Sequence, residues 1–373
     1  MSKAQVQYDV DYLVIGSGFG GSVSALRLAE KGYKVLVMEK GKWLTAKDFP
    51  KTNWNLKKWL WLPALRFFGL FKLTYFRHVT VLSGVGVGGG SLVYANTLPV
   101  PKKNFFRAES WAHLADWENE LAPFYQTALA MLGAAPNPRL ETGDLALQQL
   151  AHELGKAEHF HPTSVAVYFG KPGVTESDPY FNGKGPSRTG CSFCGGCMLG
   201  CRHNSKNTLD KNYLHLAQQL GARIQAEAEV YDVAPLDQHH GATGYRVKWR
   251  SSTAFITSRL VPLRRGKSGE YIARCVIFAG GVLGTVQLLL QLKQNSLPKL
   301  SEHVGANIRT NSESLIGVTT FDKQKVFSEG VAIGSILHTD EHSHLEPVRY
   351  SPGSGAWRLL MSPLVHGKSA LTR

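Results

Sequence analysis

The sequence predicts an α/β protein in which a Rossmann-type domain is joined to a second, α+β domain. Three observations support this fold class. A strand, a glycine-rich turn, a helix and a second strand follow one another within the first forty residues. A second glycine-rich loop follows at residues 84–90. The length of 373 residues is enough for two or three domains at about 150 residues each.

The first series of elements is a predicted βαβ unit. Asp11–Ile15 has the pattern of a short buried strand, with an apolar run at Tyr12–Ile15, and Gly16–Gly21 places glycines in the spacing G-x-G-x-x-G. Ser22–Lys31 has apolar residues at helical spacing, and Val35–Met38 is a second strand that ends at Glu39. A lone glycine motif is weak evidence, but the whole series in this order predicts a dinucleotide site.

Each part of this unit has a physical role. Gly16 permits the tight turn, Gly18 lets the backbone approach a pyrophosphate, and Gly21 lets helix and strand pack closely. The free N–H groups and the positive dipole end of the helix face the phosphates. Glu39 stands where an acid can bind the ribose hydroxyls, and its charge disfavours a 2′-phosphate and hence NADP. The motif alone does not separate FAD from NAD.

The second glycine loop has the sequence SGVGVGGGSLVYANT over residues 83–97. Its closely spaced glycines leave few side chains, so backbone N–H groups can form an anion-binding nest and a flat ring can lie on the main chain. The alternative is a flexible linker, but linkers rarely continue directly into an apolar run such as Leu92–Tyr94. The glycines of this loop are Gly84, Gly86, Gly88, Gly89 and Gly90.

Both glycine segments and several later motifs resemble the glucose–methanol–choline (GMC) flavin oxidoreductases, and among them most of all the bacterial cholesterol oxidases. The similarity extends over nearly the whole chain. The motifs that carry it are residues 16–28 (GSGFGGSVSALRL), residues 86–96 (GVGGGSLVYAN), Pro179–Phe181, a cysteine cluster followed by Ser205–Leu209, Phe278–Gly281 and Arg309–Ser314.

The resemblance implies a non-covalently bound FAD. The first loop would hold the pyrophosphate, Glu39 the adenosine ribose, and Val230 would meet the adenine. Gly90–Thr97 would lie along the flavin ring with Asn96 among the nearest groups, and Ala279–Gly281 would close the dinucleotide fold. The implied cofactor-binding residues are Gly16, Gly18, Phe19, Gly20, Gly21, Glu39, Gly90, Tyr94, Ala95, Asn96, Thr97, Val230 and Gly280.

The same resemblance implies oxidation of the CH–OH group of a sterol, a step of sterol and lipid metabolism, with molecular oxygen as acceptor. Glu346 falls where the cholesterol oxidases carry a glutamate that moves a ring double bond by proton transfer, and Asn311 would line the sterol pocket near the flavin. These are the implied catalytic residues, although Glu346 could also be an ordinary exposed glutamate. The nearby histidines His338, His342 and His344 suggest a metal site or, more simply, a solvated loop.

Four of the five cysteines stand in the spacing C-x2-C-x2-C-x3-C. This spacing is typical of a bacterial iron–sulfur site, and four thiolates can also bind zinc. Two features argue against a cluster: Arg202 stands where the ferredoxin run has proline, and no second cysteine run follows. We therefore favour a cysteine loop that binds no metal. An iron–sulfur cluster and a zinc ion both remain as alternatives. The cysteines are Cys191, Cys194, Cys197 and Cys201.

Two other functions stay open besides a sterol oxidase. The chain could be a dehydrogenase of the same fold that passes electrons through an iron–sulfur cluster to a partner. It could also be a non-catalytic remnant that at most binds FAD, because GMC members normally continue past this length and supply further flavin-facing residues from their C-terminal part. On that comparison the chain looks C-terminally truncated, and its tail, Leu359–Arg373, shows no closing strand or helix pattern.

A basic and aromatic stretch bears on possible partners. The formal net charge of +14 fits nucleic acid, an anionic membrane, a polyanionic cofactor or simply a basic solvated surface. No nucleic-acid-binding motif is present. Trp54–Arg77 interleaves aromatic residues with lysines and arginines, which predicts either an interfacial membrane segment or a buried excursion packed on the flavin domain. Pro63 and Gly69 interrupt it, so it does not predict a membrane-spanning helix.

Location and domain division complete these expectations. Residues 1–11 are polar, so we expect no signal peptide and a cytoplasmic protein, with peripheral membrane contact as an option. The predicted domains are a discontinuous FAD-binding domain at residues 1–105 and 186–292, a helical cover at 106–185, and the start of a truncated substrate-binding domain at 293–373.

Overall fold

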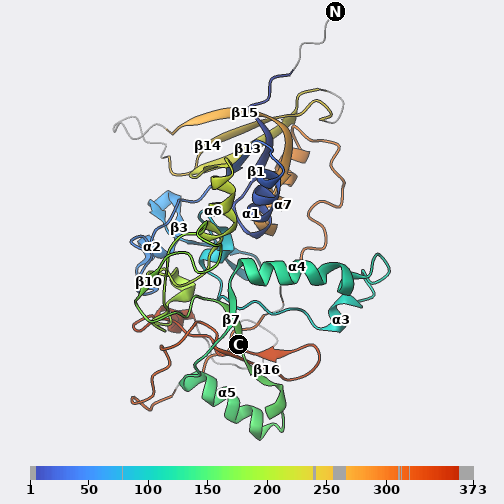
Figure 1. Ribbon diagram of the computed structural model, residues 1–373. Helices are drawn as coiled ribbons and strands as arrows, with labels where there is room; N and C mark the ends of the chain where they lie inside the picture. Colours follow the sequence, from blue (N-terminus) through green and yellow to red (C-terminus); the bar gives the residue numbers. More distant parts are fainter. Residues whose placement is uncertain are drawn as a thin grey trace, which may run out of the picture.

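The computed structural model describes residues 6–77, 79–237, 241–254, 266–309, 311, 313–318 and 320–360 (Figure 1). Two parts of the sequence-based predictions lie outside these residues. They are most of the tail, residues 361–373, and Thr310 and Ser312 of the motif at residues 309–314.

One six-stranded sheet organises the upper part of the molecule in Figure 1. The first four strands in the sheet order are parallel, and the last two continue as an antiparallel meander. In sheet order the strands are β12 (Arg223–Gln225), β2 (Val35–Met38), β1 (Val10–Ile15), β15 (Ser268–Phe278), β14 (Tyr245–Ser251) and β13 (Ala228–Pro235). The predicted α/β fold with a Rossmann-like unit is thereby confirmed.

Apolar side chains on both faces of this sheet build the core. The helices α1 (Phe19–Glu30) and α6 (Tyr213–Gln219) pack against one face, where Ala25 and Leu26 contact strand residues such as Val37. The helix α7 (Gly281–Lys293) packs near the meander at the other face. Burial of each such aliphatic side chain contributes roughly 1.5–3 kcal/mol to the stability of the fold. Because both faces of the sheet are covered, this burial stabilises the parallel strands from both sides.

A second unit occupies the lower part of the molecule (Figure 1). The strands β17 (His344–Leu345), β16 (Ser335–His338) and β8 (Phe160–Pro162) form its antiparallel sheet, and α5 (Thr142–Glu153) packs on it through Leu147 and Ala151. Within the segment predicted as a helical cover, residues 117–131 form a helix, α4. Further elements between the units are α3 (Lys103–Phe106), α4 (Trp117–Met131), β7 (Ala134–Pro136), β9 (Ser164–Ala166), β10 (Thr175–Glu176) and β11 (Arg188–Thr189).

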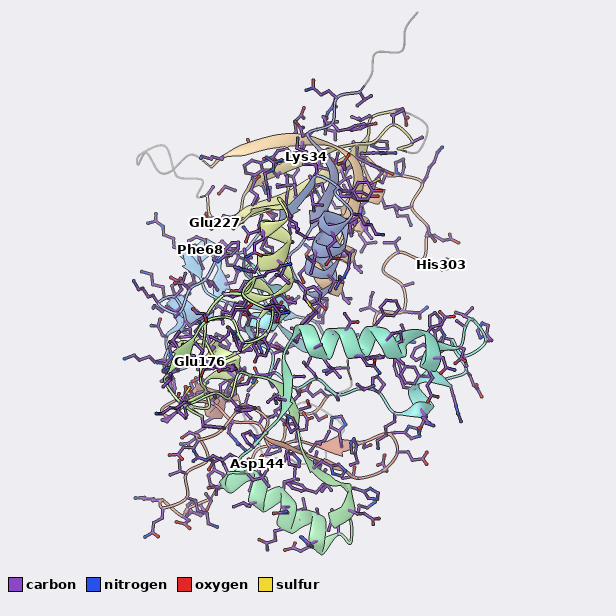
Figure 2. All side chains as sticks on the ribbon, in the orientation of Figure 1. Lys34, Phe68, Asp144, Glu176, Glu227 and His303 are labelled. Carbon is purple, nitrogen blue, oxygen red and sulfur yellow. The ribbon has the colours of Figure 1, made fainter. Side chains whose placement is uncertain are left out.

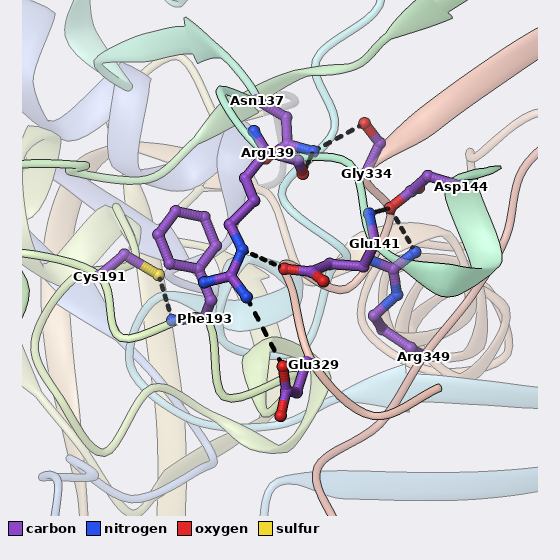
Figure 3. A network of polar contacts seen from close by, with 9 residues as sticks. All are labelled: Asn137, Arg139, Glu141, Asp144, Cys191, Phe193, Glu329, Gly334 and Arg349. Atoms are coloured by element: carbon purple, nitrogen blue, oxygen red, sulfur yellow. Dashed lines mark hydrogen bonds and ion pairs between the residues drawn. The ribbon is translucent and has the colours of Figure 1, made fainter. Parts of the chain in front are cut away.

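A buried ion pair ties α5 to the chain that follows β17. The Arg349 guanidinium lies 2.7 Å from an Asp144 carboxylate oxygen, which also accepts the Glu141 N–H at 2.9 Å (Figure 3). The other Asp144 oxygen accepts the Ser335 hydroxyl at 2.8 Å. Arg139 pairs with Glu141 nearer the surface. Asp144 lies in the lower unit, far from Lys34 at the upper end (Figure 2). The predicted domain boundaries stay a prediction.

The aromatic stretch is divided between core and surface. Trp59 is 7% exposed and packs on Phe71 and Trp357, and Trp61 is also buried, whereas Tyr75 is 73% exposed. The buried alternative therefore holds for part of this stretch, and the membrane alternative stays a prediction. No helix among the described residues is long and apolar enough to cross a membrane. The elements of the aromatic stretch are α2 (Leu56–Trp59), β3 (Trp61–Leu62), β4 (Phe67–Phe68) and β5 (Phe71–Tyr75). The last of these pairs with β6 (Thr80–Gly84), which follows the stretch.

Candidate functional site

The loops that follow β1, β2 and β15 meet at one edge of the sheet. Ile15 pairs with Met38 on one side and with Phe278 on the other, so the carboxyl ends of the three strands are level. The Gly16 N–H donates to the Met38 carbonyl, and the Ala279 N–H donates to the Ile15 carbonyl, both at 2.8 Å. Ligands of open α/β sheets bind outside this edge, so the topology brings the first glycine loop and the Ala279 turn to the expected place.

The glycines of this region fall into two physical groups. A Cβ on Gly16 or Gly21 would lie far inside van der Waals distance of backbone oxygens, those of Ala279 and Gly16 respectively. Protein packing alone therefore requires both. A Cβ on Gly18, Gly20 or Gly90 would meet no described atom within 4 Å. At these three glycines the protein backbone forms an open surface, which a ligand could approach closely.

The amino end of α1 faces this open surface without a capping group. Gly18 is the N-cap, no side chain caps the helix, and its first turn holds no acidic residue. The unpaired N–H groups and the positive end of the helix dipole are therefore available to an anion. Phe19, at the first helical position, is 41% exposed. This end fits a pyrophosphate.

Glu39 lies beside the first loop and is already hydrogen-bonded within the protein. Its Oε2 accepts the Ser17 N–H at 3.1 Å and the Ser17 hydroxyl at 2.7 Å, and its Oε1 accepts the Gly41 N–H at 2.8 Å. A carboxylate has about four acceptor positions, so one remains for a ribose hydroxyl. The Ser17 hydroxyl also accepts the Gly88 N–H at 3.1 Å and so joins both glycine loops. The sequence pattern did not indicate this role of Ser17.

The two glycine loops are in direct backbone contact. A Cβ on Gly89 would lie 2.6 Å from the Gly18 Cα, so a side chain there would push the loops apart. The Phe19 and Tyr94 rings also contact each other edge-on, with centroids 5.8 Å apart. The Tyr94 hydroxyl donates to the Asn207 carbonyl at 2.7 Å, and burial raises the pKa of Tyr94. The structure thus joins both loops into one surface.

Asn96 and its neighbours lie where this loop enters the interior. The Asn96 side chain is fully buried, its φ is +69°, and its amide has no nitrogen or oxygen partner among the described residues. The Asn96 carbonyl accepts the Ala166 N–H at 2.8 Å, and Thr97 pairs with Val165. Ala95, between them and Tyr94, is half-buried. Any contact of the Asn96 amide with a ligand would need the loop to open.

The start of β13 brings Val230 close to Glu39. The Ala228 N–H donates to the Glu39 carbonyl at 2.9 Å, and Val230 follows two residues later on the edge strand. The Val230 side chain packs in the core, so an adenine could meet this residue only through its backbone. Gly280 is exposed and forms the N-cap of α7 beside Gly16.

The four clustered cysteines line one small cavity together with Lys206. Burial raises the pKa of the Cys191 thiol to about 12. Burial also raises the pKa of Cys197, against the opposing effects of Lys206 and of the Asn96 amide. No three His, Cys, Asp or Glu side chains in the described part of the chain are arranged to hold a metal ion. The iron–sulfur and zinc alternatives therefore gain no support from the geometry.

The two implied catalytic residues lie outside the glycine loops, Asn311 before β16 and Glu346 directly after β17. Glu346 is half-buried, 3.8 Å from the His344 imidazole, and burial raises the pKa of its carboxyl, as does nearby Glu313. Exposed Asn311 donates to Glu313 at 2.6 Å. Glu313 thus binds Asn311 and also acts electrostatically on Glu346. Among the described residues, no hydrogen bond or ion pair joins either of them to the glycine loops. His338 stacks edge-on near His344, with ring centroids 5.8 Å apart.

We expect Glu346→Gln to stabilise the fold at neutral pH and not in acid. Because burial raises the pKa of Glu346, its stabilising contribution is present below the ordinary carboxyl pKa of about 4.3 and is lost as pH rises through the higher folded value. Glutamine stays neutral throughout. Urea unfolding of both proteins at about pH 7 and about pH 4 measures the difference, with exposed Glu341→Gln as control. An equal difference at both pH values would contradict the assignment.

Comparisons with known proteins agree with this geometry. A profile described as an NAD(P)-binding Rossmann-like domain matches residues 14–47. A cholesterol oxidase of Acinetobacter baumannii is 46% identical over 98% of this chain and 66% of its own length. A cholesterol oxidase of Mycobacterium tuberculosis is 43% identical over 96% of this chain and 61% of its own length. An uncharacterised GMC-type oxidoreductase of that species is 26% identical over 93% of this chain.

The chain thus spans less than two thirds of the length of the curated relatives it matches. The matched span nevertheless covers 98% and 96% of this chain. The chain belongs to the GMC oxidoreductase family.

Proposed function

We propose that this chain is the cofactor-binding part of an FAD-dependent oxidoreductase that oxidises the 3β-hydroxyl group of a sterol. The observation that carries the proposal is its identity of 46% and 43% to two cholesterol oxidases across nearly all of this chain. Molecular oxygen would be the electron acceptor, and movement of a ring double bond would follow. The alternative is a chain that binds FAD without catalysing any oxidation, and flavin binding without turnover would favour it.

The residues present fit FAD. The uncapped amino end of α1 and the open surface over Gly18 and Gly20 suit the pyrophosphate. The remaining acceptor position of Glu39 suits the adenosine ribose, and the backbone at Val230 suits the adenine. The surface from Gly90 to Thr97 is the candidate for the flavin ring.

The chemistry divides between cofactor and chain. When bound, FAD supplies the ring that accepts hydride. The chain must orient the alcohol, exclude water and handle protons. Glu346 suits proton transfer between two ring carbons, because its burial raises the pKa of the carboxyl and so makes it a stronger base when ionised. Asn311, which donates a hydrogen bond to Glu313, would line the sterol pocket.

A titration followed by a turnover assay tests the proposal. The purified chain is titrated with FAD while flavin absorbance and fluorescence are followed, and cholesterol and oxygen are then added while peroxide is measured. Flavin binding with peroxide formation supports the proposal. Flavin binding with turnover only when an artificial electron acceptor is present would favour a dehydrogenase. Absence of FAD binding would overturn the proposal.

We also propose a peripheral membrane contact through the exposed part of the aromatic stretch, since a sterol is taken from a bilayer. Leu65, Tyr75 and Phe76 are exposed there beside basic residues such as Lys72. Trp59 is unsuited to a test because its replacement would open the core. The cytoplasmic location stays a prediction.

We expect replacement of Leu65, Tyr75 and Phe76 by Ser to reduce co-sedimentation with anionic, cholesterol-containing vesicles several-fold. The loss follows from removing apolar area that would enter the headgroup region. Phe124→Ser is a matched control, because Phe124 is 68% exposed but belongs to α4. Equal pelleting of all three proteins would exclude this surface.

A further inference from the structure

Lys206 is a buried cation directly behind the second glycine loop. Lys206 is 1% exposed. The ammonium donates to three carbonyl oxygens, those of Leu92 at 3.1 Å, Tyr94 at 2.7 Å and Cys197 at 2.9 Å. All three donors of an ammonium group are therefore used. Burial strongly disfavours its charge and lowers the pKa of Lys206 to about 7, so these bonds offset a large desolvation cost.

The three acceptors belong to two different loops. Leu92 and Tyr94 belong to the second glycine loop, at the end of a short 3₁₀ turn over Gly89–Leu92, where carbonyl groups lack partners within the turn. Cys197 belongs to the cysteine loop. The ammonium also lies 4.5 Å from the centroid of the Tyr94 ring, an additional cation–π contact. One side chain thus fixes the shape of one loop against the other.

A second buried cation nearby, Arg188, has different partners. Arg188 is also 1% exposed. Its guanidinium binds the side chain of Asn204 and the segment Ser205–Asn207, including the carbonyl groups of Ser205 and Lys206. None of these partners lies in the glycine loop. Arg188 therefore stabilises the same segment without touching the loop that Lys206 holds.

We propose that Lys206 is a positioning residue for the cofactor, which fixes the carbonyl groups of Leu92 and Tyr94 and so sets the surface on which the flavin ring binds. The proposal rests on the proposed FAD function. The proposal goes beyond that function because it assigns a role to a residue that does not itself line the open surface. The contact between the Phe19 and Tyr94 rings carries the effect to the pyrophosphate end of the site.

The test compares Lys206→Met with Arg188→Met. Both remove a buried cation from the same region, and only the first removes bonds to the glycine loop. In the FAD-free chain, we expect amide hydrogen exchange in peptides covering residues 88–97 to rise at least tenfold in Lys206→Met and to stay near the parent rate in Arg188→Met. With FAD, we expect the dissociation constant to rise at least tenfold for Lys206→Met only, with altered visible circular dichroism of the bound flavin.

Lys206→Gln keeps amide donors without the charge and serves if Lys206→Met does not fold. An intermediate exchange rate confined to residues 88–97 would support the proposal. Exchange that rises equally in the Lys206 and Arg188 variants, or uniformly along the chain, would overturn it and leave Lys206 with a general stabilising role. If the parent chain binds no FAD, the proposed function fails, whereas the hydrogen-exchange comparison still decides whether Lys206 holds the loop.

Discussion

Gly21→Ala is expected to destabilise the FAD-free protein by at least about 3 kcal/mol, whereas Gly18→Ala leaves its stability within about 0.5 kcal/mol. The new Cβ on Gly21 would overlap the Gly16 carbonyl oxygen, and backbone cannot move aside as a flexible side chain can. Alanine also gains about 1 kcal/mol of helix propensity over glycine, so the clash must exceed that gain. Urea unfolding of both variants measures the two losses.

Gly18→Ala is expected to act on the cofactor instead. Gly18 has an extended backbone with φ of −71°, which alanine adopts without strain, and its Cβ would meet no described atom within 4 Å. The methyl group would occupy the surface proposed for the pyrophosphate, so the FAD dissociation constant should rise at least about tenfold. Unchanged FAD affinity in Gly18→Ala would place the cofactor elsewhere.

Arg349→Met is expected to destabilise the protein by about 3–5 kcal/mol, because it leaves the Asp144 carboxylate buried without its counter-charge. The side chains of Arg349 and Asp144 are 3% and 0% exposed, so water cannot replace the lost partner. Arg139→Met is the matched control. The Arg139 side chain is 50% exposed and pairs with Glu141 and Glu329, and its loss should change stability by about 0–1 kcal/mol.

A second variant separates the charge from packing. Asp144→Asn in the Arg349→Met background removes the unpaired carboxylate and keeps its shape, so part of the lost stability should return in urea unfolding. Similar losses for Arg349→Met and Arg139→Met would show that the buried pair contributes no more than a surface pair. No recovery in the double variant would assign the loss to packing of the Arg349 side chain.

The sequence predicted the elements whose pattern is local. The strand predicted at Val35–Met38 has these bounds in the structure, and the helix predicted from Ser22 to Lys31 is found at Phe19–Glu30. Alternation of apolar residues, helical periodicity and glycine spacing are each contained within one turn or strand. Neighbouring residues therefore suffice to specify them.

The aromatic stretch shows where this reasoning stops. Its composition suited both a membrane surface and a core, and the structure buries Trp59 while exposing Tyr75. The elements here are only a few residues long, so no period of 2 or 3.6 could mark an inward face. Which aromatic ring is buried depends on partners such as Trp357, far away in the sequence.

The sequence by itself determined the elements of the proposed cofactor site: Gly16, Gly18 and Gly21, the helix that follows them, and Glu39 directly after β2. Only the tertiary structure decided what supports it. The Ser17 hydroxyl joins the two glycine loops, and Lys206 holds the second loop from behind. A local motif is fixed by neighbouring residues, whereas a buried hydroxyl or cation gains its partners only when distant segments pack together and water is excluded.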